Sequence, residues 1–318
     1  MKNFEYAKAR SVDGAIQLST SESRYLSGGI DLLGEMKEYI VSPKRVIDLK
    51  TIPDLDRINT SGDTWKLGAN VRIAEIARND RIRATLPGLA EAAAEVGSPQ
   101  IRNVATLGGN LAQHSRCWYY RHRDLRCLKR GGSTCYAREG ENKYHSLFSG
   151  NPCISPVVSN LAVILAALDA RAIVRRGEQE LTLTFPDLYI NAWNNPLAHN
   201  SLNPADIIVR VEVPTAKNCS TYMQVSEKGD FDWALVSCAA AGQKTGSHWT
   251  QVAVFLGAVA PIPYAVDSPL LDRGELTSDS IASIGESLAS KATPLTHNGY
   301  KVPIAQALVR RCLARITT

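Results

Sequence analysis

Apolar and polar positions alternate along the first half of the chain in short runs that predict small lobes of mixed helices and strands. Residues 4–9 and 23–29 predict strands, the second ending in a glycine turn, while 12–19 and 30–40 predict helices. Further strands are predicted over 45–49 and 65–69, and helices over 71–80 and 86–96, the last with Pro87 near its first turn. These elements place a first lobe over about 1–58 and a second over 59–185.

A polar stretch rich in Asn and Pro, residues 191–206, predicts a domain boundary. Just before it, 159–176 predicts a helix that passes into a strand. Beyond it, the runs 207–214, 220–227, 234–243 and 251–259 predict strands, or a helix among strands, of a C-terminal sheet, and 280–292 and 301–316 predict helices. We therefore expect two domains, over 1–185 and 200–318.

The composition fits a folded protein of enzyme size. With 318 residues, 44% of them hydrophobic, the chain can bury a core without a disulfide scaffold. No apolar run approaches the roughly 18–20 residues that span a bilayer, and the N-terminal residues lack the apolar core of a signal peptide. We expect no membrane span and no export signal of its own.

The formal charge of +5 is too mild for a typical nucleic-acid-binding protein, but all of it lies in one segment. Between residues 116 and 143 there are three acidic residues and eight basic ones: Arg116, Arg121, Arg123, Arg126, Lys129, Arg130, Arg138 and Lys143. Four of the seven cysteines lie in the same neighbourhood, namely Cys117, Cys127, Cys135 and Cys153. We call residues 114–153 the cysteine segment.

Two glycine turns carry candidate binding chemistry. The first, Ser27–Leu33, joins a strand to a helix, and the second, Asn103–Gln113, follows the alanine-rich helix. Glycines at such junctions let a phosphate approach the backbone, whose helix N-terminal amides donate to it. A plain tight turn capped by Asp31 is the alternative for the first. Neither turn fits G-x-G-x-x-G or G-x-x-x-x-G-K-[ST], which disfavours a Rossmann site and a P-loop.

Together the turns resemble the FAD-binding signatures of the flavoprotein subunits of the molybdenum hydroxylases, the xanthine dehydrogenase family. Those signatures read approximately AGGTDL and TIGGNLA, and Gly28 and Gly108 are 80 residues apart here. The resemblance covers essentially the whole chain. It implies an α+β fold: a two-lobed FAD-binding domain of the vanillyl-alcohol-oxidase type, then an α/β C-terminal domain of the CO dehydrogenase flavoprotein type.

The resemblance also implies the residues that contact FAD. They are Arg24, Tyr25, Leu26, Ser27, Gly28, Gly29, Ile30, Asp31 and Leu32 from the first turn, Asn103, Thr106, Gly108, Gly109 and Asn110 from the second, and Ser159, Asn160 and Gln224. Three positions depart from the family pattern. Ile30 replaces a Thr, Asn160 replaces an Asp near the flavin, and Gln224 stands where a Lys is frequent, although Lys228 is close by.

The cysteine segment has its own chemistry. The four cysteines are spaced by ten, eight and eighteen residues and form no C-x-x-C pair of the kind typical of structural zinc. A [4Fe-4S] cluster, a zinc ion, free structural thiols or two disulfides all remain open on spacing alone. For a cluster, the surrounding basic residues would offset its negative charge. The family resemblance implies a cluster held by Cys117, Cys127, Cys135 and Cys153, as in bacterial periplasmic aldehyde oxidoreductase and 4-hydroxybenzoyl-CoA reductase.

The resemblance implies an oxidoreductase subunit that transfers electrons through FAD and [4Fe-4S]. Its expected partners are a molybdenum-cofactor large subunit, a [2Fe-2S] small subunit and an external electron acceptor. The alternatives are a subunit of a 4-hydroxybenzoyl-CoA reductase-like enzyme, a stand-alone flavin oxidoreductase, and a zinc-stapled interaction protein. The expected location is the cytoplasm, or the periplasm if a partner carries the export signal.

Overall fold

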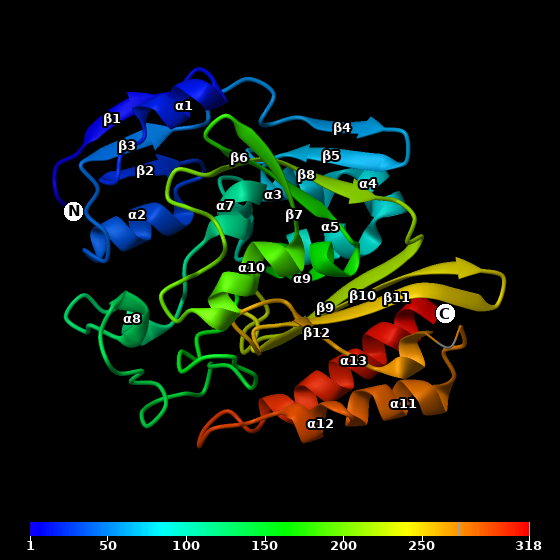
Figure 1. Ribbon diagram of the computed structural model, residues 1–318. Coiled ribbons are helices and arrows are strands. Elements are labelled where there is room, and N and C mark those ends of the chain that lie inside the picture. The colour runs from blue at the N-terminus through cyan, green and yellow to red at the C-terminus, as the bar shows by residue number, and fades with distance from the viewer. Residues whose placement is uncertain (273, 318) are drawn as a thin grey trace.

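The computed structural model describes residues 1–272 and 274–317, and its first lobe is built on a three-stranded parallel sheet (Figure 1). The strands are β1 (Glu5–Lys8), β3 (Arg45–Asp48) and β2 (Ser23–Leu26), in that order across the sheet. Helix α1 (Val12–Leu18) follows β1, and helix α2 (Ile30–Lys37) follows β2 directly after the first glycine turn. The predicted order of strands and helices is confirmed here.

The second lobe contains a five-stranded antiparallel sheet. Its order is β4 (Ile58–Ser61), β5 (Thr64–Gly68), β8 (Ile207–Pro214), β6 (Arg171–Arg176) and β7 (Gln179–Thr184). Strand β8 pairs with both β5 and β6, with Val211 opposite Leu67 on one side and Ala172 on the other. The expectation that 207–214 belongs to a C-terminal sheet is therefore wrong. The apolar pattern of these residues identifies a strand but does not show which sheet the strand belongs to.

Seven helices complete the second lobe within the described residues. They are α3 (Ile73–Arg78), α4 (Asp80–Thr85), α5 (Pro87–Ala94), α6 (Pro99–Arg102), α7 (Leu107–Ala112), α9 (Asn160–Ala167) and α10 (Phe185–Asn194). Helix α10 begins behind Thr184, whose hydroxyl accepts from the Asp187 amide, and runs into the stretch predicted as a boundary. The second lobe thus extends beyond residue 200 through β8.

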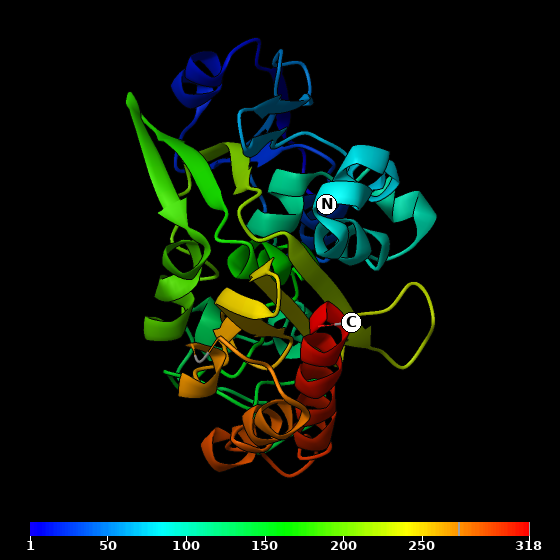
Figure 2. The ribbon, with the colours of Figure 1, turned by 90° about the vertical axis from the view of Figure 1, so that its right-hand side faces the viewer.

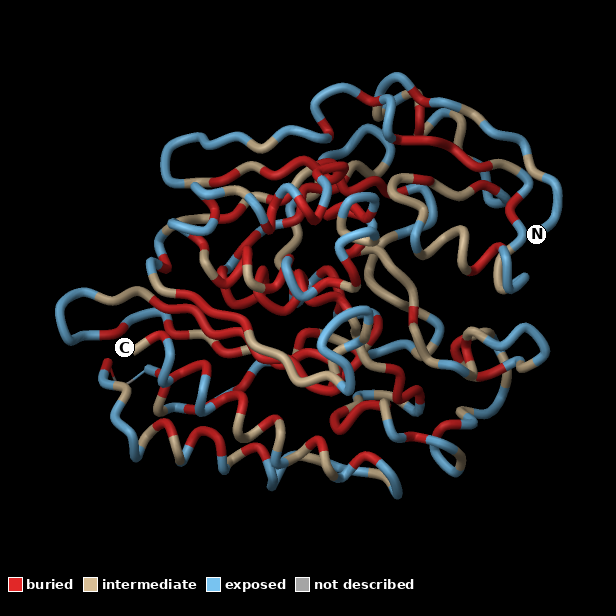
Figure 3. The backbone as a smooth tube through the Cα atoms, turned by 180° about the vertical axis from the view of Figure 1, so that it is seen from behind, coloured by how far each residue is buried: buried red, intermediate tan, exposed pale blue. Residues whose placement is uncertain are grey.

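The C-terminal part is a four-stranded antiparallel sheet covered by helices on both faces (Figures 1 and 2). The elements are β9 (Cys219–Val225), β10 (Val236–Thr245), β11 (His248–Gly257), β12 (Tyr264–Ala265), α11 (Ser278–Glu286), α12 (Leu288–Lys291) and α13 (Lys301–Thr317). Alternate residues of β10 face opposite ways: Ala239 and Ala241 pack in the core with α5 and α9, whereas Cys238 and Ala240 pack with α13. This buried sheet appears mostly red in Figure 3.

The cysteine segment is irregular, with one short helix, α8 (Trp118–Arg121), and a 3-10 turn at Leu128–Arg130. It lies between the first lobe and the C-terminal helices (Figure 1). At its beginning Arg116 contacts Asp31 of α2, and toward its end the Leu147 amide donates to Val259 O at 2.7 Å. These contacts attach the segment to both parts of the molecule.

Candidate functional site

The first glycine turn is fixed by backbone crowding. Gly29 has a φ of 77° and caps helix α2, a conformation that favours glycine. A Cβ on Gly28 would lie 2.3 Å from the carbonyl oxygen of Val104, just before the second turn. The two turns therefore meet closely enough that only glycine fits between them. No side chain caps α2, so its first-turn amides are free to face a ligand.

The second turn is held by the chain after β5. Thr106 caps α7 by accepting from the Gly109 amide at 3.3 Å, and the Gly108 amide donates to Ala69 O at 2.8 Å. Ser27 connects the two turns, because its Oγ lies 2.9 Å from Thr106 Oγ1, and buried Asn70 holds it there by accepting from the same Oγ at 2.6 Å. Sequence reasoning missed Asn70, which lies in no glycine motif.

A cavity of about 190 Å³ opens between the two turns. Its walls come from both turns, from the apolar side chains of Val96, Ile101, Ala105 and Ala112, and from Arg116 and Trp233. Arg116 lies 4.9 Å from the Trp233 ring centroid, so the two side chains form a cation–π contact in the wall. The mixed polar and apolar lining suits a nucleotide-like ligand.

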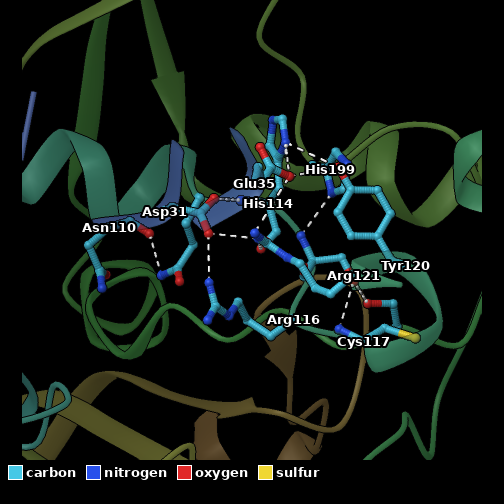
Figure 4. Close-up of polar contacts among 12 residues, drawn as sticks. Asp31, Glu35, Asn110, His114, Arg116, Cys117, Tyr120, Arg121 and His199 are labelled. Atoms are coloured by element: carbon cyan, nitrogen blue, oxygen red, sulfur yellow. Dashed lines mark hydrogen bonds and ion pairs between the residues drawn. The ribbon is translucent and has the colours of Figure 1, made fainter. Parts of the chain in front are cut away.

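Helix α2 is joined to the cysteine segment by a charged network (Figure 4). Asp31 Oδ1 accepts from Arg116 Nη1 at 2.8 Å and from Arg121 Nη2 at 2.6 Å, while its other oxygen accepts from the His114 amide at 2.9 Å. Glu35, one turn further along α2, contacts His114 Nδ1 at 3.1 Å and accepts from Tyr120 at 2.8 Å. The carboxylate beside the α2 N-terminus is thus neutralised and turned toward the cysteine segment.

Asp31, Glu35 and His114 bring their ligand atoms within 4.8 Å of one another. Burial alone would raise the pKa of Glu35, but the hydrogen bond and charge of His114 and the charge of Arg121 outweigh it and lower that pKa. Two arginines already satisfy the carboxylates. The group is therefore an ion-pair network rather than a metal site.

All four cysteines of the segment line one small cavity, together with Lys129 and His145, and we call it the cysteine cavity. A single zinc ion would hold its thiolates about 3.8 Å apart, given Zn–S bonds of about 2.3 Å. Among the described residues, which include these cysteines, no other group of three ligand atoms comes within 4.8 Å besides the one containing Asp31. No three of the four Sγ atoms are therefore close enough together for a tetrahedral zinc site.

Buried polar groups lie around this cavity without the partners that such groups usually have. Burial raises the pKa of Cys117 to about 12 and lowers that of His145 to about 4, helped there by the charge of Lys301. His145 Nε2 is 3.1 Å from Cys117 Sγ, and its Nδ1 is buried without a hydrogen-bond partner. Burial also lowers the pKa of Lys129, which the four nearby cysteines oppose.

The basic residues of the segment do not gather around the cysteines as expected. Arg116 and Arg121 pair with Asp31, Arg123 pairs with Asp124, and Lys143 pairs with Glu227. Arg130 and Arg138 donate to backbone carbonyls. Of the eight, Lys129 alone lines the cysteine cavity. The expectation that the whole basic excess offsets a cluster is wrong, because three of the eight pair with acidic residues distant in sequence, one pairs with its neighbour, and two donate to backbone carbonyls.

A family model described as the FAD binding domain in molybdopterin dehydrogenase matches residues 2–216. The chain belongs to this family. The aldehyde oxidoreductase FAD-binding subunit PaoB of Escherichia coli (strain K12) is 30% identical over 99% of this chain and 98% of its own. The carbon monoxide dehydrogenase medium chain of Afipia carboxidovorans is 33% identical over 98% and 96%. The solved reconstituted CO dehydrogenase from Oligotropha carboxidovorans shares the fold, with a TM-score of 0.78, 20% identity, and coverage of 99% and 98%.

The expected family and the α+β fold are therefore confirmed, and the chain is a FAD-binding oxidoreductase subunit of the molybdenum hydroxylase type. Its match to the FAD-binding family extends to residue 216, which agrees with β8 completing the second sheet. None of the helices in the described ranges is both long and apolar enough to cross a membrane.

The structure of this FAD-binding subunit brings most of the predicted contact residues to the cavity between the two turns, which we call the FAD cavity. Those that line it are Arg24, Tyr25, Ser27, Gly28, Gly29, Ile30, Asp31, Leu32, Thr106, Gly109 and Asn110. Leu26, Asn103, Gly108, Ser159, Asn160 and Gln224 do not line it. Their contact with FAD stays a prediction.

One of the residues outside the cavity contacts its wall, since Ser159 Oγ donates to Asn110 Oδ1 at 2.6 Å. Asn160 and Gln224 contact each other, with Asn160 Nδ2 donating to Gln224 Oε1 at 3.0 Å. Sequence reasoning missed Trp233 in the wall, because it follows an acidic loop between β9 and β10 far from either turn.

Proposed function

We propose that this chain carries both FAD and a [4Fe-4S] cluster and transfers electrons within an aldehyde oxidoreductase-like molybdenum hydroxylase. A large molybdenum subunit and a small [2Fe-2S] subunit would supply the electrons, and an external acceptor would receive them. The observation that carries the proposal is the attachment of a four-cysteine cavity, through Arg116 and Arg121, to the helix that walls the FAD cavity.

The FAD cavity suits the group in the charge and the backbone donors of its walls. The uncapped N-terminus of α2 offers backbone amides to a pyrophosphate, and Gly28 and Gly29 keep side chains out of its way. Asp31 would repel a phosphate, but two arginines neutralise its carboxylate. Arg24 and Arg116 add positive charge to the cavity wall.

The cysteine cavity fits a cluster in its donor set. Four thiols converge there. Because the pKa of Cys117 is high, the bound iron would have to displace the proton of this thiol. The surrounding tyrosines and Ser155 restrict water. When bound, FAD can exchange electrons singly or in pairs, and a [4Fe-4S] cluster exchanges one at a time.

The chain's own residues position these groups relative to one another. Cys117 directly follows Arg116, which lines the FAD cavity and contacts Asp31. Arg121 is the last residue of helix α8, which follows Cys117, and it donates to Ser115 O at 2.7 Å as well as to Asp31. One structural unit thus holds the first thiol and one end of the FAD cavity.

The test is a measurement of metal and flavin on the purified chain with its copurifying partners. We expect two further subunits, about one FAD per chain, and about four irons per chain beyond those that the small [2Fe-2S] subunit carries. In Cys135→Ser these four irons should be lost while the iron of the small subunit remains, whereas Cys219→Ser, at a cysteine on β9 outside the cavity, should retain all of it. Flavin with no iron beyond that of the small subunit would contradict the cluster, and zinc without flavin would support an interaction protein instead.

The place of the cluster in electron transfer needs a second measurement. In Cys135→Ser, a slower flavin reduction would support an electron path through the cluster. A lower melting temperature with an unchanged flavin reduction rate would instead make the cluster a structural staple for the segment.

A further inference from the structure

Three lysines are buried in the described part of the chain, and two of them differ from the third. Lys217 has an ordinary partner, because its Nζ lies 2.7 Å from the Asp169 carboxylate. Within the described residues, Lys129 and Lys301 have no carboxylate oxygen within 4.0 Å. An isolated buried ammonium is costly, so a nearby anion is expected for each.

Lys129 lies in the wall of the cysteine cavity. It follows Cys127 by two residues, is 7% exposed, and its Nζ donates only to Ala198 O at 2.7 Å. A carbonyl oxygen satisfies one of its three donors and none of its charge. The four thiols of the same cavity are the acidic groups that surround it.

Lys301 contacts His145, a residue that lines the same cavity. It is the first residue of the 17-residue helix α13, where the helix dipole disfavours a cation. It is fully buried, and its Nζ donates to Ala258 O at 2.9 Å and to His145 O at 3.1 Å. The His145 ring is itself 3.1 Å from Cys117 Sγ. One residue therefore separates the ammonium from the first thiol.

We infer that Lys129 and Lys301 are the counter-charges of the metal cluster and raise its reduction potential. The inference rests on the proposed cluster, whose unit of irons and thiolates is anionic and whose potential depends on net charge and burial. The exposed arginines of the segment act weakly, because solvent screens them and most already have partners. Neither lysine is proposed to bind iron.

The first test measures the midpoint potential of the cluster by an EPR-monitored redox titration of the purified complex. Lys129→Met and Lys301→Met remove the charge and keep an apolar stem of similar length. Both should lower the potential, Lys129→Met by more, because it lines the cavity. Lys217→Met, which removes a paired buried lysine, and Arg123→Met, which removes an exposed arginine, should leave the potential unchanged.

The second test uses thermal stability, which separates a counter-charge from an ordinary packing role. In the cluster-free Cys135→Ser chain each buried lysine either keeps an uncompensated charge or gives up its proton, and both lower the stability of the fold, so adding either lysine-to-methionine change should raise the melting temperature. In the cluster-loaded chain the same change should lower it. A packing role predicts a loss in both forms.

The outcomes distinguish the inference from the proposal beneath it. A wild-type complex with no iron beyond that of the small [2Fe-2S] subunit would overturn the cluster and the inference together. Iron at the wild-type level with an unchanged potential in both lysine variants would overturn the inference alone. If either loaded variant proves too unstable to titrate, the comparison of melting temperatures in the Cys135→Ser background tests the inference instead. A melting temperature lowered by the lysine change in that background would overturn the inference.

Discussion

Replacing Arg121 by methionine should loosen the junction between helix α2 and the cysteine segment. The guanidinium is 15% exposed, donates to Asp31 at 2.6 Å and to Ser115 O at 2.7 Å, and lies 3.7 Å from Glu35 Oε1. Methionine retains much of the apolar stem but leaves the Glu35 carboxylate, which is 3% exposed, with only His114 and Tyr120.

The size of the effect follows from this burial. Removing one partner of a fully buried ion pair costs about 3–5 kcal/mol, and because Asp31 retains Arg116 we expect about 2–4 kcal/mol here. For a chain of this length that corresponds to a fall in melting temperature of roughly 3–6 °C, because the entropy of unfolding grows with chain length. The FAD dissociation constant should rise too, because Asp31 beside the α2 N-terminus is then less fully neutralised.

Differential scanning calorimetry and flavin fluorescence titration measure the two effects. Arg123→Met is the matched control, since Arg123 lies in the same segment, is 61% exposed and pairs only with Asp124, so its loss should cost less than about 1 kcal/mol. If Arg121→Met melted within a degree of Arg123→Met, the junction would not contribute to stability and the reasoning from burial would be refuted.

Three further changes test the turns and the buried lysine. Gly28→Ala places a Cβ 2.3 Å from Val104 O and should lower the stability by about 1–3 kcal/mol and weaken FAD binding. Gly34→Ala, in helix α2 where a Cβ meets open space, should do neither, and equal flavin affinities in the two variants would contradict the crowding. Gly132→Ala places a Cβ 1.9 Å from Arg126 O beside Cys127 and should lower the iron content. Gly229→Ala, where a Cβ meets open space, should leave the iron content unchanged, and full iron in Gly132→Ala would show that its turn can relax. Burial lowers the pKa of Lys301 from 10.5 to about 7. Between pH 7 and pH 10, Lys301 of the cluster-free chain therefore loses its proton when the chain folds. Because the unfolded chain binds more protons there, stability should rise as pH increases from 7 toward 10, and a Lys301→Met chain with the same slope would argue against this assignment.

Local sequence was enough to predict much of this protein. The periodicity of apolar residues identified most helices and strands, because burial of one face depends on spacing within an element. The two glycine turns were recognisable because Gly29 adopts a positive φ and Gly28 touches backbone, requirements that other residues do not meet. Their pairing placed the chain in its family before any contact was known.

Tertiary structure decided the features that depend on residues far apart in the chain. Strand β8 reads as a strand from its own residues, yet its place between β5 and β6 depends on partners more than thirty residues away. The basic charge of the cysteine segment was visible in the sequence, but pairing with Asp31 removes Arg116 and Arg121 from charge compensation at the cysteines. Lys301 comes next to His145, which lines the cysteine cavity, only because α13 folds back against that residue. Spacing along the chain determines which face of an element is apolar, whereas charge compensation depends on distances that only the folded chain sets.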